Sequence, residues 1–405
     1  MTDYRYELLA LERMINEKKG YSQVLLSLQK EEKISQKRFS LLKENLHTLF
    51  RHYFTLSFEC MNILSVKKNS REFFLALIAL TLLRYSKEEK DVILEDYQDT
   101  FSRCRLSGNP SLNAAKMEEA SASAFVIPEE VKSNKILYHS LLLQVPPFLL
   151  KKLSSEMGEQ KAIEVLSEYR KKATTYYLLL NDDAPIKDFL PLPDKMKLVY
   201  EGEEKDIRKC RYVSEHAYSL LPIPNLEAKV LMMGNMHSDS FIPIAKRLSY
   251  VERASLTVAF EEEKKEKKAQ SLLSNYEGVN TISSPLYLLK TYLPFSSYDD
   301  VIVLGKSSEC GRRKAYLFPA LEEEDLLSSI LSMKAQLKEA APFVRKGGTL
   351  LFVQHSLLKE EGEMVIQDFL ASNKDFIIVE EKQIYATESQ AESGYYCLLK
   401  RTQND

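Results

Sequence analysis

The stretch YDDVIVLGKSSECG (residues 298–311) joins a short apolar run to a polar turn in the C-terminal half of the chain. Its centre, VIVL (301–304), is β-branched and carries no charge, which is typical of a strand buried on both faces of a parallel sheet. Glycine and serine follow at once, as in a turn at the end of a strand. We therefore expect a strand followed by a loop at the ligand-binding edge of a doubly wound sheet.

Further strand candidates lie before and after this one, and helical segments separate them. They are KVLMM (229–233), SLTVAF (255–260), TLLFVQ (349–354), FIIVEEKQIYA (376–386) and YYCLLKR (395–401). Charged segments such as EEEKKEKKAQSLLSNY (261–276) have the character of helices. Short apolar strands that alternate with helices predict an α/β, Rossmann-like domain over residues 221–405.

The N-terminal part of the chain has a helical pattern instead. Apolar residues recur there at spacings of three and four, and almost no glycine or proline interrupts them, which predicts an all-α domain over residues 1–135. The small, polar segment SGNPSLNAAKMEEASASA (107–124) predicts a loop. Pro146 and Pro147 are typical of a helix start, and TYYLLLN (175–181) is typical of a strand. We therefore expect a connecting subdomain over residues 136–220.

Composition limits the classes of function. The 405 residues contain 56 Lys and Arg against 58 Asp and Glu, so a strongly basic surface over the whole chain is excluded, although local basic patches are not. The five cysteines lack the spacing of a zinc site, so no metal is expected. The longest apolar run, FFLALIALTLL (73–83), is too short to span a bilayer, and no signal peptide is indicated. We expect a soluble, cytoplasmic protein.

Several segments match, in order, the pattern of one enzyme family. The match lies in VPPFLLKKL (145–153), YVSEHAYSLL (212–221), RKGGTLLF (345–352) and SGYYCLLKR (393–401). In these segments the chain resembles the Sun/Fmu-type ribosomal RNA cytosine-5 methyltransferases. The resemblance implies a NusB-like helical domain, a connecting subdomain and a Rossmann-like domain that uses S-adenosylmethionine.

The cofactor loop of that family, VLDLCAAPGGKT, corresponds to VLMMGNMHSDSF (230–241) in this chain. Met232 replaces an acidic residue, and Ser238 and Asp239 replace a glycine pair that lets backbone amides approach the cofactor. The resemblance places S-adenosylmethionine against Gly234 and Asp239, and the replacements predict that its binding is impaired.

A third cofactor position implied by the resemblance is Glu261, which follows the strand SLTVAF and would accept hydrogen bonds from the ribose hydroxyls. The alternative is an ion pair between Glu261 and Lys265 on a solvated helix face. On the adenine side, Ser283, Ser284 and Pro285 stand where the family has Gly-Asp-Ala.

The two catalytic cysteines of the family are also replaced. Ser307 and His355 occupy their positions, and Leu304 replaces the aspartate before the first of them. Methylation at C5 of cytosine requires a thiolate that adds to C6, which a serine hydroxyl does not supply without a strong base. For His355 the alternative is an ordinary histidine at a strand end, satisfied by water or backbone. Cys310 is the fallback nucleophile, because basic neighbours would lower the pKa of its thiol.

Basic residues cluster around the same loop: Lys306, Arg312, Arg313 and Lys314. At the carboxyl edge of a doubly wound sheet such a cluster could hold RNA phosphates. The alternative is a solvated loop that balances the acidic run EEED (322–325).

The sequence thus predicts a methyltransferase scaffold with degenerate motifs. Such a pseudoenzyme would bind either ribosomal or other structured RNA or a partner protein in ribosome assembly. Two alternatives stay open. One is an active S-adenosylmethionine-dependent RNA methyltransferase that modifies a nitrogen or oxygen and needs no cysteine adduct. The other is a protein–protein adaptor that uses the helical domain, in keeping with the near-neutral charge.

Overall fold

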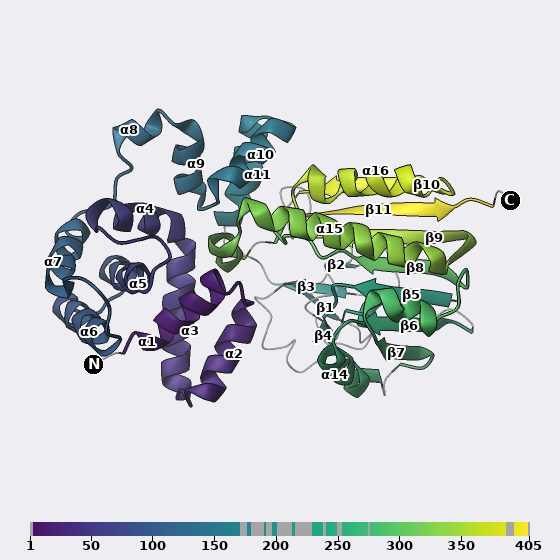
Figure 1. Cartoon of the computed structure of the whole chain (residues 1–405), viewed down its shortest axis with the longest axis horizontal. Coiled ribbons are helices and arrows are strands. Elements are labelled where there is room, and N and C mark those ends of the chain that lie inside the picture. The colour runs from purple at the N-terminus through teal and green to yellow at the C-terminus, as the bar shows by residue number, and fades with distance from the viewer. Residues whose placement is uncertain are drawn as a thin grey trace. The chain divides into compact units, whose positions relative to one another are not determined.

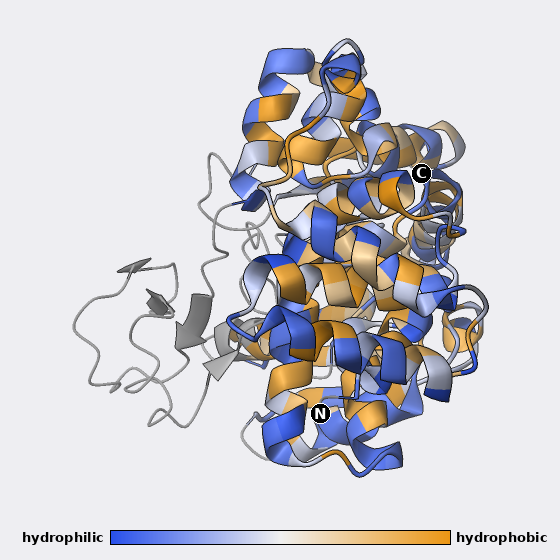
Figure 2. Ribbon diagram, turned by 90° about the vertical axis from the view of Figure 1, so that its left-hand side faces the viewer, coloured by the Kyte–Doolittle hydropathy of each residue, from blue (hydrophilic) through white to orange (hydrophobic). Residues whose placement is uncertain are grey.

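The computed structural model describes most of the chain, in two compact units (Figure 1). Hydrophobic and hydrophilic residues alternate along many of its helices, as in amphipathic helices (Figure 2). The described residues are 3–170, 176–179, 190–191, 197–200, 213–214, 229–237, 240–248, 253–273, 276–312, 314–385 and 393–403. The helical unit comprises Met1–Lys171 and Lys314–Glu322, and the sheet unit comprises Lys172–Arg313 and Glu323–Asp405.

The sheet unit contains a seven-stranded sheet in the order β10-β11-β9-β8-β5-β6-β7. Its strands are β5 (Lys229–Gly234), β6 (Ser255–Phe260), β7 (Val279–Ser283), β8 (Tyr298–Leu304), β9 (Val344–Gln354), β10 (Phe376–Ile384) and β11 (Gly394–Arg401). Neighbouring strands from β7 to β9 are parallel, whereas β11 is antiparallel to both β9 and β10. The chain leaves β5 for β6 on one side and returns as β8 on the other, so the order reverses between β5 and β8, where doubly wound folds bind ligands.

Helices cover both faces of this sheet (Figure 1). They are α13 (Ile242–Leu248), α14 (Glu263–Leu273), α15 (Glu323–Ala340) and α16 (Glu363–Ser372), with short helices η6 (Leu286–Thr291), η8 (Ala341–Phe343) and η9 (Lys359–Glu361). Apolar residues of α15 and α16 pack on one face, and those of α13 and α14 on the other. Val301, Ile302 and Val303 of β8 are fully buried between the two layers, which explains the apolar run from which the strand was predicted.

A second, smaller sheet in the same unit has the antiparallel order β2-β3-β1-β4. Its strands are β1 (Tyr176–Leu179), β2 (Leu190–Pro191), β3 (Lys197–Tyr200) and β4 (Val213–Ser214). The strand predicted from TYYLLLN is confirmed as β1.

The helical unit is built around one buried helix. Its helices are α1 (Arg5–Leu11), η1 (Glu12–Asn16), α2 (Tyr21–Glu31), α3 (Gln36–Arg51), α4 (Tyr53–Ile63), α5 (Arg71–Tyr85), α6 (Lys90–Arg103), α7 (Pro110–Ser121), α8 (Glu129–Lys132), α9 (Lys135–Leu143), α10 (Pro147–Met157), α11 (Glu159–Ser167), η2 (Glu168–Arg170) and η7 (Ala315–Ala320). The longest apolar run of the sequence lies in α5, where Phe73, Ile78 and Leu80 are buried. Within the described part of the chain, no helix is both long and apolar enough to cross a bilayer.

The loop predicted over residues 107–124 is wrong, because α7 occupies most of it. The side chain of Asn109 accepts a hydrogen bond from the amide of Leu112, and Pro110 stands in the first turn, where its missing N–H costs nothing. Ala114 and Met117 are buried against the bundle. A good N-cap and tertiary packing therefore prevail over the small, polar composition.

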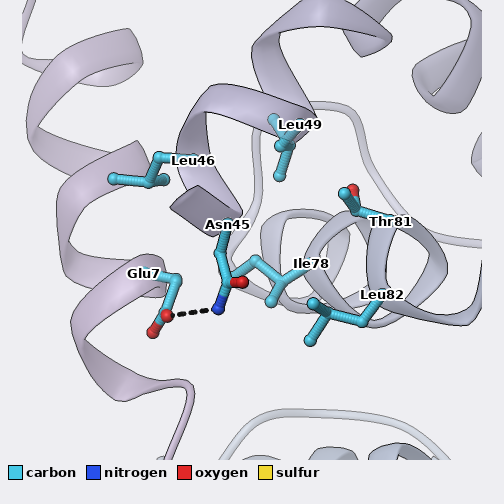
Figure 3. A pocket seen from close by; sticks show the side chains of 7 residues that line it. All are labelled: Glu7, Asn45, Leu46, Leu49, Ile78, Thr81 and Leu82. Carbon is cyan, nitrogen blue, oxygen red and sulfur yellow. Dashed lines mark hydrogen bonds between the residues drawn. The ribbon is translucent and has the colours of Figure 1, made fainter. Parts of the chain in front are cut away.

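Two buried ion pairs link helices of this unit. Arg38 binds Glu7, at 2.7 Å from Nη1 to Oε1, and Asn45 donates to the same carboxylate at 2.9 Å. Arg84 likewise binds Glu59, with Nε 2.9 Å from Oε2. Figure 3 shows Glu7 and Asn45 beside a small gap lined mainly by leucine and isoleucine side chains, and this gap has no room for a water molecule. It is therefore a packing defect of the bundle and no ligand site.

Gly234, at the end of β5, generates a stability prediction. Its φ is +106°, and a Cβ on it would overlap the carbonyl oxygen of Leu304 in β8. Gly347 has a similarly positive φ of +77°, but there a Cβ would meet the flexible side chain of Gln403 at 3.0 Å. We expect Gly347→Ala to lower the free energy of unfolding by about 1–2 kcal/mol, and Gly234→Ala to lower it by about 3 kcal/mol or more, because a backbone carbonyl cannot move aside. Urea unfolding followed by circular dichroism measures both, and equal costs would contradict the close approach.

Candidate functional site at the carboxyl edge of the sheet

The loops that follow β5, β8 and β9 begin side by side at the carboxyl edge of the sheet. The amide of Asn235 donates to the carbonyl of Leu304 at 2.7 Å, and the amide of Gly305 donates to that of Val353 at 2.7 Å. These bonds extend the sheet past its last paired residues. The structure thus brings Gly234, the Ser307 loop and His355 to one edge of the doubly wound sheet.

Apolar side chains fill the space under the first of these loops. Met232 is fully buried and Met236 is 2% exposed, and both belong to one core cluster with Phe241. His237 is exposed, and its amide donates to the hydroxyl of Ser240 at 2.9 Å. The predicted cofactor residue Asp239 and its neighbour Ser238 lie outside the described residues. Gly234 itself is explained by its contact with β8, so a cofactor is not needed to account for a glycine there.

Glu261 lies exposed just beyond the carboxyl end of β6. The alternative partner proposed for it is wrong, because Lys265 forms its ion pair with Glu262, at 2.7 Å. The amide of Ser284, in the segment that replaces the adenine-side motif, donates to the carbonyl of Phe260 at 2.9 Å, and Ser284 is buried. Glu261 is thus left at the edge with its carboxylate in solvent.

The loop after β8 carries two serines, and they have different environments. Ser307, at the first cysteine position, is 8% exposed, and its hydroxyl accepts a hydrogen bond from the amide of Glu309 at 3.3 Å. Ser308 donates twice to Glu361, from its amide to Oε1 at 2.7 Å and from its hydroxyl to Oε2 at 2.5 Å. Ser307 is therefore a turn residue, and no base is bonded to its hydroxyl among the described residues.

Glu361 joins the loops of this edge through its hydrogen bonds, and no pattern in the sequence indicated it. Its side chain is fully buried in η9, between the loops that follow β8 and β9. Burial raises the pKa of this carboxyl, and the hydrogen bonds from Ser308 and Ser356 oppose that rise. Glu361 lies in an acidic run that leads into α16, a pattern typical of a solvated helix start, so periodicity could not reveal that this one carboxylate points inward.

Cys310 is buried in the same network. Its Sγ lies 3.2 Å from the hydroxyl of Ser356 and accepts a hydrogen bond from the amide of Leu357 at 3.4 Å. Burial, together with the nearby carboxylate of Glu361, raises the pKa of the Cys310 thiol to about 11. The expectation that basic neighbours lower this pKa is therefore wrong, because loss of hydration outweighs their charge.

His355, at the second cysteine position, is half-buried, and its backbone joins the two loops. Its carbonyl accepts a hydrogen bond from the amide of Gly311 at 3.1 Å, and the carbonyl of Gly311 accepts one from the amide of Ser393 at 2.8 Å. A Cβ on Gly311 would overlap the carbonyl oxygen of Ser393, so only glycine fits between these strands. Gln354, which precedes His355, is 1% exposed. Its side-chain amide has no hydrogen-bond partner in the described part of the chain.

The four basic residues of the loop do not share one environment. Lys306 is exposed, and its amide donates to the side chain of Gln336 at 3.0 Å. Arg312 is only 8% exposed and pairs with Glu309 at 3.7 Å, whereas Lys314 belongs to the helical unit. Arg313 lies outside the described residues. Their role in binding RNA stays a prediction.

The acidic run EEED (322–325) does not serve only to balance the positive charge of the Lys306 loop. Its first residue, Glu322, forms an ion pair with Lys18 of the helical unit at 2.8 Å. Across the described ranges, no three histidine, cysteine or carboxylate side chains come together as a metal site.

Comparisons with known proteins show the fold. No protein-family model matches the chain, and no curated protein matches its sequence. Among solved structures, the protein PH0851 aligns over 99% of this chain and 100% of its own, with a TM-score of 0.73 at 12% identity. A methyltransferase homolog protein from Pyrococcus horikoshii aligns over 66% of this chain and 99% of its own, with a TM-score of 0.53 at 14% identity. The sheet unit therefore has the Rossmann-like methyltransferase fold that the sequence predicted.

The burial of Cys310 yields a prediction about thiol reactivity. Iodoacetamide at pH 8 should alkylate Cys104, which is partly exposed, and leave Cys310 unmodified in the native protein, because a buried thiol with a pKa of about 11 carries almost no thiolate there. Peptide mapping by mass spectrometry measures both sites, and the same reaction in denaturant controls for intrinsic reactivity. Native alkylation of Cys310 as fast as that of Cys104 would show that the loop opens and the thiol is available.

Proposed function

We propose that this protein keeps the scaffold of an RNA methyltransferase but binds RNA without methylating it. The observation that carries the proposal is the state of the two cysteine positions. Ser307 is a turn residue, and the one thiol of the loop, Cys310, is buried and protonated at neutral pH. A thiolate that adds to C6 of cytosine is therefore missing where the family places it.

The residues of the cofactor loop do not fit S-adenosylmethionine well. Met232 stands at the acidic position of the family motif and is sealed inside the sheet, and Met236 packs under the loop. Apolar side chains at these places offer no acceptor for the cofactor's ammonium or hydroxyl groups. We therefore derive no chemical step through this cofactor.

A second candidate function rests on Glu261. Its exposed carboxylate follows β6 at the edge where doubly wound enzymes bind ribose hydroxyls. An S-adenosylmethionine-dependent enzyme that methylates nitrogen or oxygen would use this residue and would need no cysteine. Met232 and Met236 count against it, so we place it second.

The wider proposal includes the organisation inferred from the sequence. The helical part, residues 1–135, would be NusB-like, residues 136–220 would connect it to the Rossmann-like domain of residues 221–405, and the protein would act in the cytoplasm on ribosomal or other structured RNA. A ribosome-assembly protein is a further partner consistent with this organisation.

Radiolabelled methyl transfer tests the proposal. The full chain and a Ser307→Cys, His355→Cys variant are incubated with methyl-labelled S-adenosylmethionine and ribosomal RNA, and filter binding measures RNA retention in the same samples. We expect RNA retention and no labelled RNA in either case, since the variant restores both thiols but leaves Met232 in the cofactor loop. Methylation by the unaltered protein would refute the proposal, whereas methylation by the variant alone would show that the cysteines, and not the cofactor loop, are what the protein lacks.

A further inference from the structure

The helical unit carries a stacked pair of aromatic rings at its surface, in a part of the sequence outside the motifs discussed above. His52, which follows α3, and Tyr85, the last residue of α5, lie parallel at 15°, with ring centroids 4.1 Å apart. Tyr85 is 44% exposed, whereas the other described Phe and Tyr residues of this unit are buried or half-buried. The pair thus presents a fixed ring, held from behind by a second ring, to solvent.

Two arginines flank this pair. Arg51 precedes His52 at the end of α3, and Arg170 lies in η2, where it donates to the carbonyl of Leu142. Both guanidinium groups are exposed, and across the described ranges neither forms an ion pair with a carboxylate. Burial lowers the pKa of His52, and the positive charges of Arg170 and Arg51 lower it further.

The two arginines form a local basic patch on this unit. Arg51 and Arg170, without a carboxylate partner in the described ranges, leave a local positive field on a chain whose formal net charge is −2. The other arginine of this region, Arg84, is neutralised by Glu59, so the chain supplies a buried acid for one arginine and none for its neighbours. The pattern indicates an anionic ligand that also has a flat ring.

We propose that Tyr85, with Arg51 and Arg170 beside it, binds an unstacked base and the adjoining phosphates of single-stranded RNA. Every RNA base, whatever the sequence, has a π-face that can stack on the exposed ring of Tyr85. The guanidinium group of an arginine donates hydrogen bonds to phosphate oxygens. An acidic peptide would satisfy the arginines but would leave the ring unused. This inference rests on the proposed RNA-binding function and places the contact on the helical unit, apart from the loop at Lys306.

Fluorescence anisotropy of the full chain with a labelled single-stranded RNA of about 12 nucleotides tests the inference, with the matching duplex as a second probe. We expect Tyr85→Ala to weaken binding of the single strand about tenfold, the loss of one stacked base, and Tyr85→Phe to stay within about twofold of the parent. Arg51→Gln combined with Arg170→Gln should reduce the slope of log affinity against log salt by about 1.4, or about 0.7 for each phosphate contact. Lys37→Gln, at the opposite end of α3, removes one positive charge away from the ring pair, half of the charge that the arginine variant removes, and as the control it should change little.

The outcomes separate this site from the wider function. If the single strand binds as tightly to Tyr85→Ala as to the parent, while Lys306→Ala loses binding, the RNA contact is at the sheet edge, so the aromatic site is refuted and the proposed function stands. If the parent binds neither RNA, both fall. Equal effects of Lys37→Gln and the arginine variant, or tighter binding of duplex than of single strand, would also contradict a base held on Tyr85. Loss with Tyr85→Ala and retention with Tyr85→Phe support it.

Discussion

The close approach of β5 and β8 at Gly234 is the constraint on which the carboxyl edge of the sheet depends. A glycine with positive φ lets the backbone of β5 pass directly against the carbonyl of Leu304, and the next amide then bonds to that carbonyl at 2.7 Å. The order of the strands reverses at this junction, so any ligand of the fold would lie just above it. In this chain the junction is closed by backbone and by the buried side chains of Met232 and Met236.

A second closure holds the other half of the edge. The carboxylate of Glu361 accepts hydrogen bonds from the amide and the hydroxyl of Ser308. The hydroxyl of Ser356 connects this network to Cys310. A buried carboxylate without a cation is costly, and its hydrogen bonds compensate only because the surrounding loops are held in one geometry. Rigidity at this edge suits a binding surface or a structural support better than a nucleophile that must reach a base.

The fold was predictable from the sequence for a physical reason, and the site was only partly so. Apolar runs such as VIVL are typical of strands buried in a parallel sheet, and strand candidates alternate with helical segments, so the apolar pattern predicts the sheet. The parallel order of β5, β8 and β9 brings Gly234, the Ser307 loop and His355 to one edge of the sheet, and their roles stay a prediction. Which carboxylate of an acidic run turns inward depends on tertiary hydrogen bonds, and no local pattern encodes Glu361. The prediction of a lowered pKa for Cys310 was wrong for the same reason. Neighbours in the sequence indicate the local charge but do not indicate burial.

Isothermal titration calorimetry of the full chain tests whether the carboxyl edge of this sheet holds S-adenosylmethionine. The cofactor and its demethylated product are each titrated into the protein, with Met232→Asp as a variant that restores the acid at the family position. We expect no heat of binding for the unaltered chain at micromolar to submillimolar concentrations. Saturable micromolar binding to the unaltered chain, weakened when Glu261 is replaced by alanine, would contradict it and favour an active enzyme.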